Sequence, residues 1–285
     1  LATIYVSATF AGSITAILIN TPGTSAAAAT TFDGYPLAQK GEAGRALGIA
    51  VISSTVGGIF SVLILCFAAP LLARVAYEFR SPEYFALTVF GLSMLASISA
   101  GGAVKNLIGG IFGVWLSTIG AERVTGIERF MFGNYELYEG LHFVPIFIGL
   151  FAISELLVQS KTVDKIIKTV SMKAVKLPTL EDYKKIWKTI LRSCGIGTFI
   201  GVLPAEGATV ASMIGYSEAR RWSKNKKEFG KGSIEGIAGA EAANNAATGG
   251  AMVPTMVLGI PGSGTTAIIL VGLMVHGLRP GVYLF

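Results

Sequence analysis

Two short motifs in this sequence combine proline, glycine and hydroxyl side chains in a pattern that could bind an anion. The first reads N-T-P-G-T-S at residues 20–25, and the second reads I-P-G-S-G-T at residues 260–265. A helix that begins after such a break directs free backbone N–H groups and its positive dipole end at the break, so a carboxylate could bind there. The glycines could equally serve close packing, and the hydroxyls could cap their own helices, so both interpretations stay open.

Two amides and three carboxylates near these motifs extend the candidate site. Asn244 and Asn245 could coordinate a carboxylate or Na⁺, or could lock two helices together. Carboxylates at membrane depth are costly and often functional, so Asp33, Glu206 and Glu241 are candidates for ion coupling. Asp33 could instead cap the turn F-D-G-Y-P, because Asp-Gly favours turns. The predicted substrate-binding residues are Asn20, Thr21, Pro22, Gly23, Thr24, Ser25, Asn244, Asn245, Pro261, Gly262, Ser263, Gly264 and Thr265.

The sequence contains no pattern typical of an enzyme or a metal site. His142 and His276 are isolated, without a cluster of cysteine, histidine and carboxylate at metal-ligand spacing. Serines are plentiful, but none is paired with a base in a recognisable pattern, and no phosphate-binding G-x-x-x-x-G-K-[ST] motif occurs. We therefore predict no catalytic residues, no metal site and no cofactor other than Na⁺ or H⁺ as a coupling ion.

Three helix breaks would have to position the candidate groups. They lie at residues 20–24, at residues 203–207 (L-P-A-E-G) and at residues 259–263 (G-I-P-G-S), each inside an apolar segment. Proline and glycine interrupt helical hydrogen bonding. In hydrocarbon an unpaired N–H or C=O is costly, so a break survives only where protein covers it or where it lines a cavity. Broken helices at membrane depth are typical of solute sites in secondary transporters.

The composition places the chain in a membrane. Hydrophobic residues make up 52% and charged residues 14%, with mean hydropathy +0.63, whereas soluble domains average about 25% charged. The net charge of +6 could suggest nucleic acid, but the Lys and Arg residues fall in short loops between apolar runs. That distribution is typical of cytoplasmic loops. We predict an all-α polytopic integral membrane protein with broken or re-entrant helices and internal repeats.

The alternation of apolar and basic segments predicts three parts. They are a first membrane half at residues 1–158, a basic cytoplasmic linker at residues 159–192 and a second membrane half at residues 193–285, with both halves partial because the chain starts and ends in apolar stretches. A second basic loop covers residues 220–231. If both basic segments stay cytoplasmic, residues 193–219 enter the membrane, turn and return as a re-entrant hairpin. The alternative is a full crossing with one basic loop outside.

Two self-matches indicate the internal repeats. Aligning Pro22 with Pro261 pairs T-P-G-T with I-P-G-S, and each motif follows an apolar segment and precedes a tract rich in Ala and Thr. A second match, in another register, pairs G-Y-x-x-A at residues 34–38 with the same pattern at residues 215–219. Together they suggest a duplicated architecture, in which many transporters build the solute site at the repeat interface.

Longer strings around these motifs carry a family resemblance. They include N-T-P-G-T-S-A-A-A-A-T-T-F-D-G-Y-P at residues 20–36, T-G-I-E-R-F-M-F-G at residues 125–133, E-A-A-N-N-A-A-T-G-G-A-M-V-P at residues 241–254 and L-G-I-P-G-S-G-T-T-A at residues 258–267. On these strings the chain resembles the large membrane subunit of the tripartite tricarboxylate transporters, the TctA family. That subunit is longer, so the chain resembles its middle portion. One departure is L-P-A-E-G at residues 203–207, where the family has a string like I-P-G-A-G, so a carboxylate stands in place of a small residue.

The resemblance implies a bacterial inner-membrane symporter for di- or tricarboxylates such as citrate. It also implies a small membrane subunit and a periplasmic solute-binding protein as partners, membrane lipid around the chain and no nucleic acid. The breaks would then form the anion site, and an ion gradient would drive uptake. Two other classes stay open: a channel, which would need a continuous polar stripe, and a membrane-embedded enzyme, which would need a catalytic pair. The sequence does not distinguish Na⁺ from H⁺ coupling or one carboxylate from another.

Overall fold

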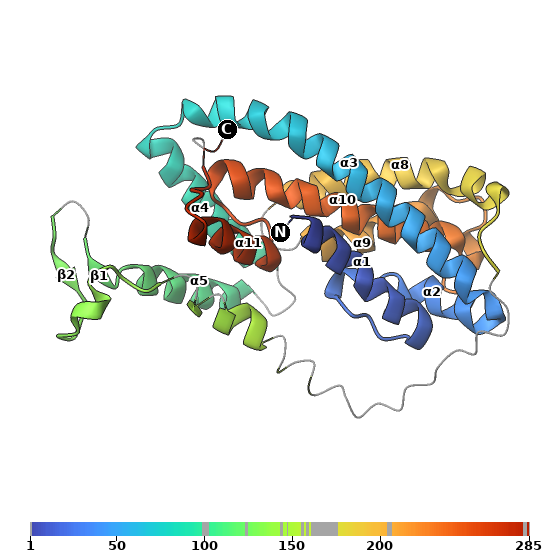
Figure 1. Cartoon of the computed structure of the whole chain (residues 1–285), viewed down its shortest axis with the longest axis horizontal. Helices are drawn as coiled ribbons and strands as arrows, with labels where there is room; N and C mark the ends of the chain where they lie inside the picture. Colours follow the sequence, from blue (N-terminus) through green and yellow to red (C-terminus); the bar gives the residue numbers. More distant parts are fainter. Residues whose placement is uncertain are drawn as a thin grey trace. The chain divides into compact units, whose positions relative to one another are not determined.

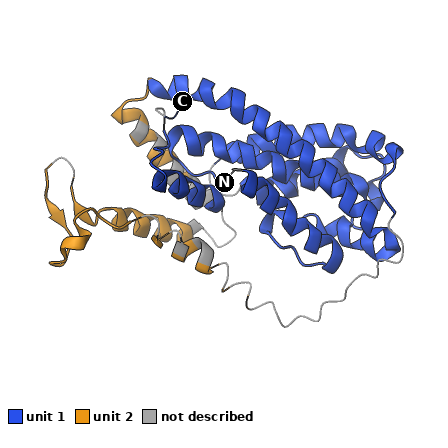
Figure 2. Cartoon of the chain, viewed as in Figure 1, with its two compact units in different colours: residues 1–77, 166–285 blue, residues 78–165 orange. Residues whose placement is uncertain are grey.

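The chain is mostly helical, as predicted. The computed structural model describes residues 2–98, 103–122, 125–142, 145–146, 148–154, 157, 160, 176–203, 207–281 and 284 (Figure 1). By packing, these residues form two units, one from residues 1–77 and 166–285 and the other from residues 78–165 (Figure 2). The two units are defined by packing contacts, whereas the predicted parts 1–158, 159–192 and 193–285 were defined by membrane topology. The predicted parts therefore stay predictions.

The first unit is built around one small-residue helix. Its elements are α1 (Ala2–Ile19), η1 (Ser25–Ala27), α2 (Thr31–Leu37), η2 (Ala38–Glu42), α3 (Ala43–Tyr77), α8 (Leu180–Val202), α9 (Gly207–Trp222), η5 (Lys226–Glu228), α10 (Ile234–Leu258) and α11 (Gly264–Val275). Nearly every residue of α10 is buried, and α3, α8 and α9 pack along it (Figure 1). A Cβ added at Gly57 of α3 would lie 2.5 Å from the carbonyl oxygen of Ala242, so the absent side chain lets the two backbones approach closely.

The second unit contains the helices α4 (Ser81–Ile98) and α5 (Ala103–Ser117) and several short elements. β1 (Gly120–Ala121) pairs antiparallel with β2 (Glu128–Arg129), and η3 (Tyr135–Leu137) and η4 (Ile148–Ile153) follow. The two-residue strands are a small departure from an all-α fold. Lys105 lies inside α5.

The structure bears on the membrane prediction only in part. Among the described residues, one helical run, Thr31–Tyr77, is long and apolar enough to cross a membrane by length and composition. Thr3–Ile19, Val104–Ser117 and Gly264–Val275 are shorter apolar helices. α8 ends and α9 begins on either side of the predicted turn at residues 203–207, and the two helices pack against one another. The number of crossings and the re-entrant character of this hairpin stay predictions.

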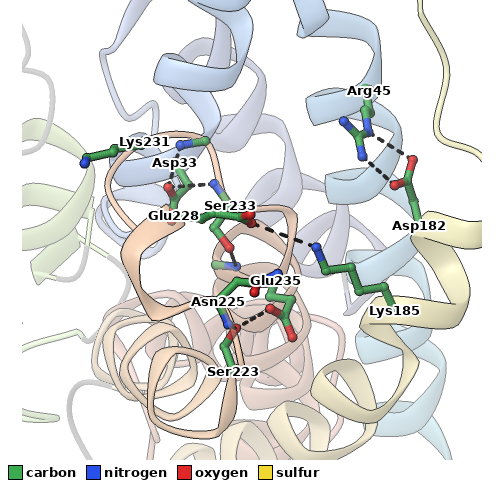
Figure 3. A network of polar contacts seen from close by, with 12 residues as sticks. Asp33, Arg45, Asp182, Lys185, Ser223, Asn225, Glu228, Lys231, Ser233 and Glu235 are labelled. Atoms are coloured by element: carbon green, nitrogen blue, oxygen red, sulfur yellow. Dashed lines mark hydrogen bonds and ion pairs between the residues drawn. The ribbon is translucent and has the colours of Figure 1, made fainter.

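A charged network joins α3 to α8 in the first unit. Arg45 donates from Nε to Asp182 at 2.9 Å (Figure 3). Arg45 also pairs with Glu42. The Arg45 guanidinium holds the pKa of the Asp182 carboxyl below its usual range. Asp182 also accepts from the backbone N–H of Thr179, and Thr179 caps α8 in return. The basic segment predicted as a linker therefore ends in the first turns of a packed helix.

Candidate functional site

The first break, residues 20–24, turns back onto the helix it follows. α1 ends at Ile19, and Asn20 adopts a left-handed backbone with φ of 55°. The N–H of Gly23 then donates to the carbonyl of Gly12 at 3.0 Å. A Cβ on Gly23 would lie 2.9 Å from the Cα of Gly12, so the contact requires glycine. Thr24 follows in extended conformation and begins η1.

The second break, residues 259–263, repeats this backbone. α10 ends at Leu258, and Gly259 is left-handed with φ of 69°. A Cβ on Gly262 would lie 2.9 Å from the Cα of Ala251. The alignment of Pro22 with Pro261 pairs Ala251 with Gly12. The second break therefore contacts its helix at the position that the first break contacts.

The N–H of Gly262, unlike that of Gly23, donates to a side chain, Oγ1 of Thr255 at 3.1 Å, but one backbone hydrogen bond is common to the two breaks. The N–H of Thr21 donates to the carbonyl of Thr15 at 3.4 Å, and the N–H of Ile260 donates to the carbonyl of Pro254 at 3.4 Å. The alignment of Pro22 with Pro261 pairs Thr21 with Ile260 and Thr15 with Pro254. The self-match between the two Pro-Gly motifs is therefore a match of three-dimensional structure as well as of sequence.

The two helices that carry these breaks run antiparallel. Near the end of α1, Ser13 bonds to Glu241 in the first half of α10. Near its start, Tyr5 packs with Met252 in the last part of α10, and its hydroxyl lies 3.3 Å from Oγ of Ser263. The same break at the ends of antiparallel helices is the arrangement that an inverted repeat produces.

The helix α9, which follows the third predicted break at residues 203–207, contacts the regions of the other two breaks. Residues 204–206 lie outside the described residues, and with them the ion-coupling candidate Glu206. Beyond the break, Oγ1 of Thr209 donates to Oγ of Ser25 in η1 at 2.9 Å. A Cβ on Gly207 would lie 3.9 Å from the side chain of Ala251, the residue on which the second break packs. The first break, the second break and the start of α9 therefore converge on the part of α10 that follows Glu241.

The predicted amide pair lies at this convergence. Asn244 and Asn245 are fully buried, and Nδ2 of Asn244 reaches the carbonyl of Ala26 in η1 at 3.4 Å. Nδ2 of Asn245 donates to Oδ1 of Asn244 at 2.7 Å. Among the described atoms without a hydrogen-bond partner, two buried acceptors lie near this convergence, Oδ1 of Asn245 and Oγ1 of Thr24. A buried polar atom without a partner is rare in proteins and marks a place where a ligand or water can bind.

The exposure of the first break suits an anion site. Asn20, Thr21, Pro22, Gly23 and Ser25 are exposed, whereas the second break is buried or half-buried. Along α1, Gly12 at the first break and Tyr5 at the second are two turns, or about 10 Å, apart. Hydroxyls and helix N-termini separated by this distance can contact different carboxylates of one small polycarboxylate.

Glu241 is held by hydroxyls from three separate elements. Its side chain is fully buried, and Oε1 accepts from Oγ of Ser13 at 2.6 Å and from Thr30. Oε2 accepts from Oγ of Ser54 on α3 at 2.7 Å. None of the ion pairs between described residues includes Glu241. Sequence reasoning singled out this carboxylate but did not identify its three hydroxyl partners.

Asp33 has a different set of contacts. Its Oδ1 accepts from the backbone N–H groups of Gly232 and Ser233, both at 2.8 Å, and Ser233 is the N-cap of α10 (Figure 3). The segment from Phe32 to Pro36 is helical rather than the predicted turn, because this carboxylate bonds to the N-terminus of α10 instead of to its own neighbours. Ion coupling by Asp33 stays a prediction, although these bonds alone give the residue a structural role.

Comparisons with known proteins show which family and which relatives the chain resembles in sequence. The family model for the tripartite tricarboxylate transporter TctA family matches residues 1–285. The chain is 42% identical over 280 residues to an uncharacterized 52.8 kDa protein in the TAR-I ttuC' 3'region of Agrobacterium vitis, covering 98% of this chain and 55% of that protein. It is 45% identical over 85 residues to an uncharacterized protein in the TAR-II ttuC' 3'region of the same organism, covering 30% of this chain and 35% of that protein. The chain thus spans about half or less of each relative. No solved structure matches it.

Proposed function

Because the chain belongs to the tripartite tricarboxylate transporter TctA family, we propose that it forms the centre of a secondary transporter subunit that imports di- or tricarboxylates such as citrate. The family is one of transporters rather than enzymes, and its members are membrane proteins. We place the subunit in the bacterial inner membrane, surrounded by lipid, with a small membrane subunit and a periplasmic solute-binding protein as partners. Import is driven by an ion gradient.

The convergence of the first break, the second break and the start of α9 is the observation that carries this proposal. In the proposed site, one substrate carboxylate binds at the first break, where it accepts from the hydroxyls of Thr24 and Ser25 and from Thr209 at the start of α9. The N-terminal turn of α9 adds free N–H groups and a partial positive charge. Asn244 lies beside η1 and completes this end of the site.

A second carboxylate of the same substrate would bind toward the second break. There Pro261, Gly262 and Ser263 precede the N-terminus of α11, and Gly264 and Thr265 form its first turn. Two subsites about 10 Å apart along α1 favour an elongated anion with several carboxylates over a monocarboxylate. The substrate class proposed from the family and the spacing of the breaks therefore agree.

Uptake by the full-length complex tests this function. The transporter that contains this chain is reconstituted in proteoliposomes with its small subunit and binding protein, and uptake of labelled citrate is followed with and without an ion gradient. We expect saturable accumulation only with a gradient. Saturable flux that ignores the gradient would refute symport, and flux that does not saturate would indicate a channel.

A pair of threonine variants tests the site itself. Thr209→Ala removes a hydroxyl beside the first break, and we expect it to raise KM for citrate uptake about tenfold or more, the usual worth of a hydrogen bond to a charged group. Thr55→Ala is the matched control, because the Thr55 hydroxyl on α3 is exposed and bonds only to the carbonyl of Val51 in its own helix. Equal KM values for the two variants would contradict the proposed position of the site.

A further inference from the structure

Glu241 is a fully buried carboxylate that forms no ion pair with a described residue, and it does not accept from a helix N-terminus as Asp33 does. Asp182 pairs with Arg45, and Glu218 pairs with Arg221. Glu241 is completely buried in the first unit, where three hydroxyls donate to it and the uncharged side chain of Asn244 lies beside it. A buried charge without a partner is very costly, so such a group either binds a cation or takes up a proton.

The hydrogen bonds around Glu241 leave room for one more hydrogen. A carboxylate offers about four lone-pair sites. The hydroxyls of Ser13 and Thr30 fill two sites on Oε1, and that of Ser54 fills one on Oε2. One site on Oε2 is left. Asn245 stands one helical turn further along the same face of α10, and its Oδ1 has no donor. A single proton bound to Oε2 would fill this site, and it could be donated to an acceptor on the same helix face such as this amide oxygen.

The same contacts favour a proton over a metal ion. The oxygen atoms of Ser13 and Ser54 lie 2.6 and 2.7 Å from the carboxylate, which is the length of a direct bond from a hydroxyl to a charged oxygen. A metal ion would have to separate these groups inside a segment of α10 that is fully buried. A proton needs no additional space.

We propose that Glu241 is the proton-carrying residue of the transporter, an inference that rests on the proposed function. The carboxylate takes one H⁺ from the aqueous phase and becomes a carboxylic acid whose O–H donates to Oδ1 of Asn245. On the other side of the membrane the same O–H bond breaks, and H⁺ returns to water. No other bond forms or breaks, and one proton moves for each cycle of Glu241.

The elements that hold Glu241 connect it to the proposed anion site. Thr30 follows η1, which begins at the first break, and Asn244 of α10 contacts η1 directly. Hydroxyl donors stabilise the ionised carboxylate, whereas burial favours the neutral acid. Any movement of η1 that withdraws Thr30 when an anion binds would therefore increase proton affinity. By linkage, a bound proton would increase anion affinity by the same factor.

Other inward-facing ionisable groups on the neighbouring elements are engaged elsewhere. Tyr5 on α1 bonds to Ser263, and Asp33 on α2 bonds to the N-terminus of α10. Tyr216 on α9 packs against Phe32 and Phe229, and Cys194 on α8 lies in the apolar core. Arg45 of α3 is paired with Asp182 of α8, and η1 contains only Ser and Ala. None of the hydrogen bonds found between described residues joins these groups to Glu241.

The test compares driven uptake with exchange in the full-length complex in proteoliposomes. Glu241→Gln keeps the shape of the protonated acid but cannot release a proton. We expect this variant to exchange labelled for unlabelled citrate at nearly the wild-type rate and to lose accumulation driven by a pH gradient by at least about tenfold. Glu218→Gln is the control, since Glu218 pairs only with Arg221 and Trp222 near the end of α9, and it should retain both activities.

A second variant tests the inference independently in case Glu241→Gln does not fold. Ser54→Ala removes one donor to the ionised carboxylate, so the pH of half-maximal uptake should move upward by about one to two units. Accumulation by Glu241→Gln at the wild-type level, an unshifted pH profile in Ser54→Ala, or wild-type accumulation driven by a Na⁺ gradient without proton movement would each overturn the inference. Wild-type vesicles without any citrate exchange would instead overturn the proposed function itself.

Discussion

The first and second breaks have the same backbone, but their side chains are engaged to different degrees. In the second break, Ser263 and Thr266 cap α11 reciprocally, with bonds of 3.2 and 2.8 Å between each side chain and the other's backbone N–H. Oγ1 of Thr255 accepts from the N–H of Gly262 and donates to the carbonyl of Ala251. The polar groups around the second break therefore bond to one another.

The first break is open by comparison. Thr24 occupies the position of Ser263, but its side chain makes no capping bond, and its Oγ1 has no partner in the described structure. Ser25 is exposed and bonds only to a hydroxyl from another helix. One motif has thus been used twice, once with its polar groups satisfied internally and once with them available. The difference predicts that the first break contributes side-chain hydroxyls to the proposed site and that the second contributes backbone N–H groups at the start of α11.

The largest expected effect comes from substitutions at Gly12 and Ala251, the helix residues against which the two breaks pack. Gly12→Ala would place a Cβ 2.5 Å from Oγ1 and 2.6 Å from the N of Thr24, so we expect a loss of about 1–3 kcal/mol of stability from overpacking. The matched change in the second repeat, Ala251→Gly, removes a methyl from a helix and should cost about 1 kcal/mol. Apparent melting temperatures of the purified full-length subunit show which of the two variants loses more stability. A smaller loss for Gly12→Ala than for Ala251→Gly would contradict the close packing of the first break.

Removing a hydroxyl from the first break should weaken substrate binding, whereas removing one from the second break should lower stability. Thr24→Ala removes an oxygen without a partner, so stability should hardly change while KM for citrate uptake rises about tenfold or more. Ser263→Ala removes a helix cap and should cost about 0.5–2 kcal/mol of stability, with KM nearly unchanged. Thr24→Ser keeps the hydroxyl and serves as the control for KM. If Ser263→Ala raises KM more than Thr24→Ala does, the roles of the two breaks are reversed.

The repeated backbone could be predicted from the sequence because it depends on local residue types. The alignment of Pro22 with Pro261 placed both breaks and paired Gly12 with Ala251, although the packing at that pair became visible only in the structure. Proline and glycine restrict the chain wherever they occur, so their pattern indicates a break without knowledge of the rest of the fold.

The hydroxyl shell of Glu241 could not be predicted in the same way. Ser13, Thr30 and Ser54 are 228, 211 and 187 residues away from it in sequence, and their meeting depends on how four helical elements pack. The same reason explains the wrong turn prediction at residues 32–36, since Asp33 bonds to groups about 200 residues away. Local patterns located the polar residues of this protein, but only tertiary packing determined their partners.

The smallest expected effect concerns the left-handed residue that opens each break. Asn20 and Gly259 have φ of 55° and 69°, a region that Gly and Asn enter more easily than other residues. Asn20→Gly and Gly259→Asn should therefore leave the melting temperature nearly unchanged, whereas Ala at either position should cost about 1–2 kcal/mol. Citrate uptake by Asn20→Gly then tests the prediction that the Asn20 amide contacts substrate. We expect KM to change less than about threefold, because the left-handed backbone by itself explains an asparagine here. A tenfold rise with unchanged stability would show that the first break differs from the second at this position too.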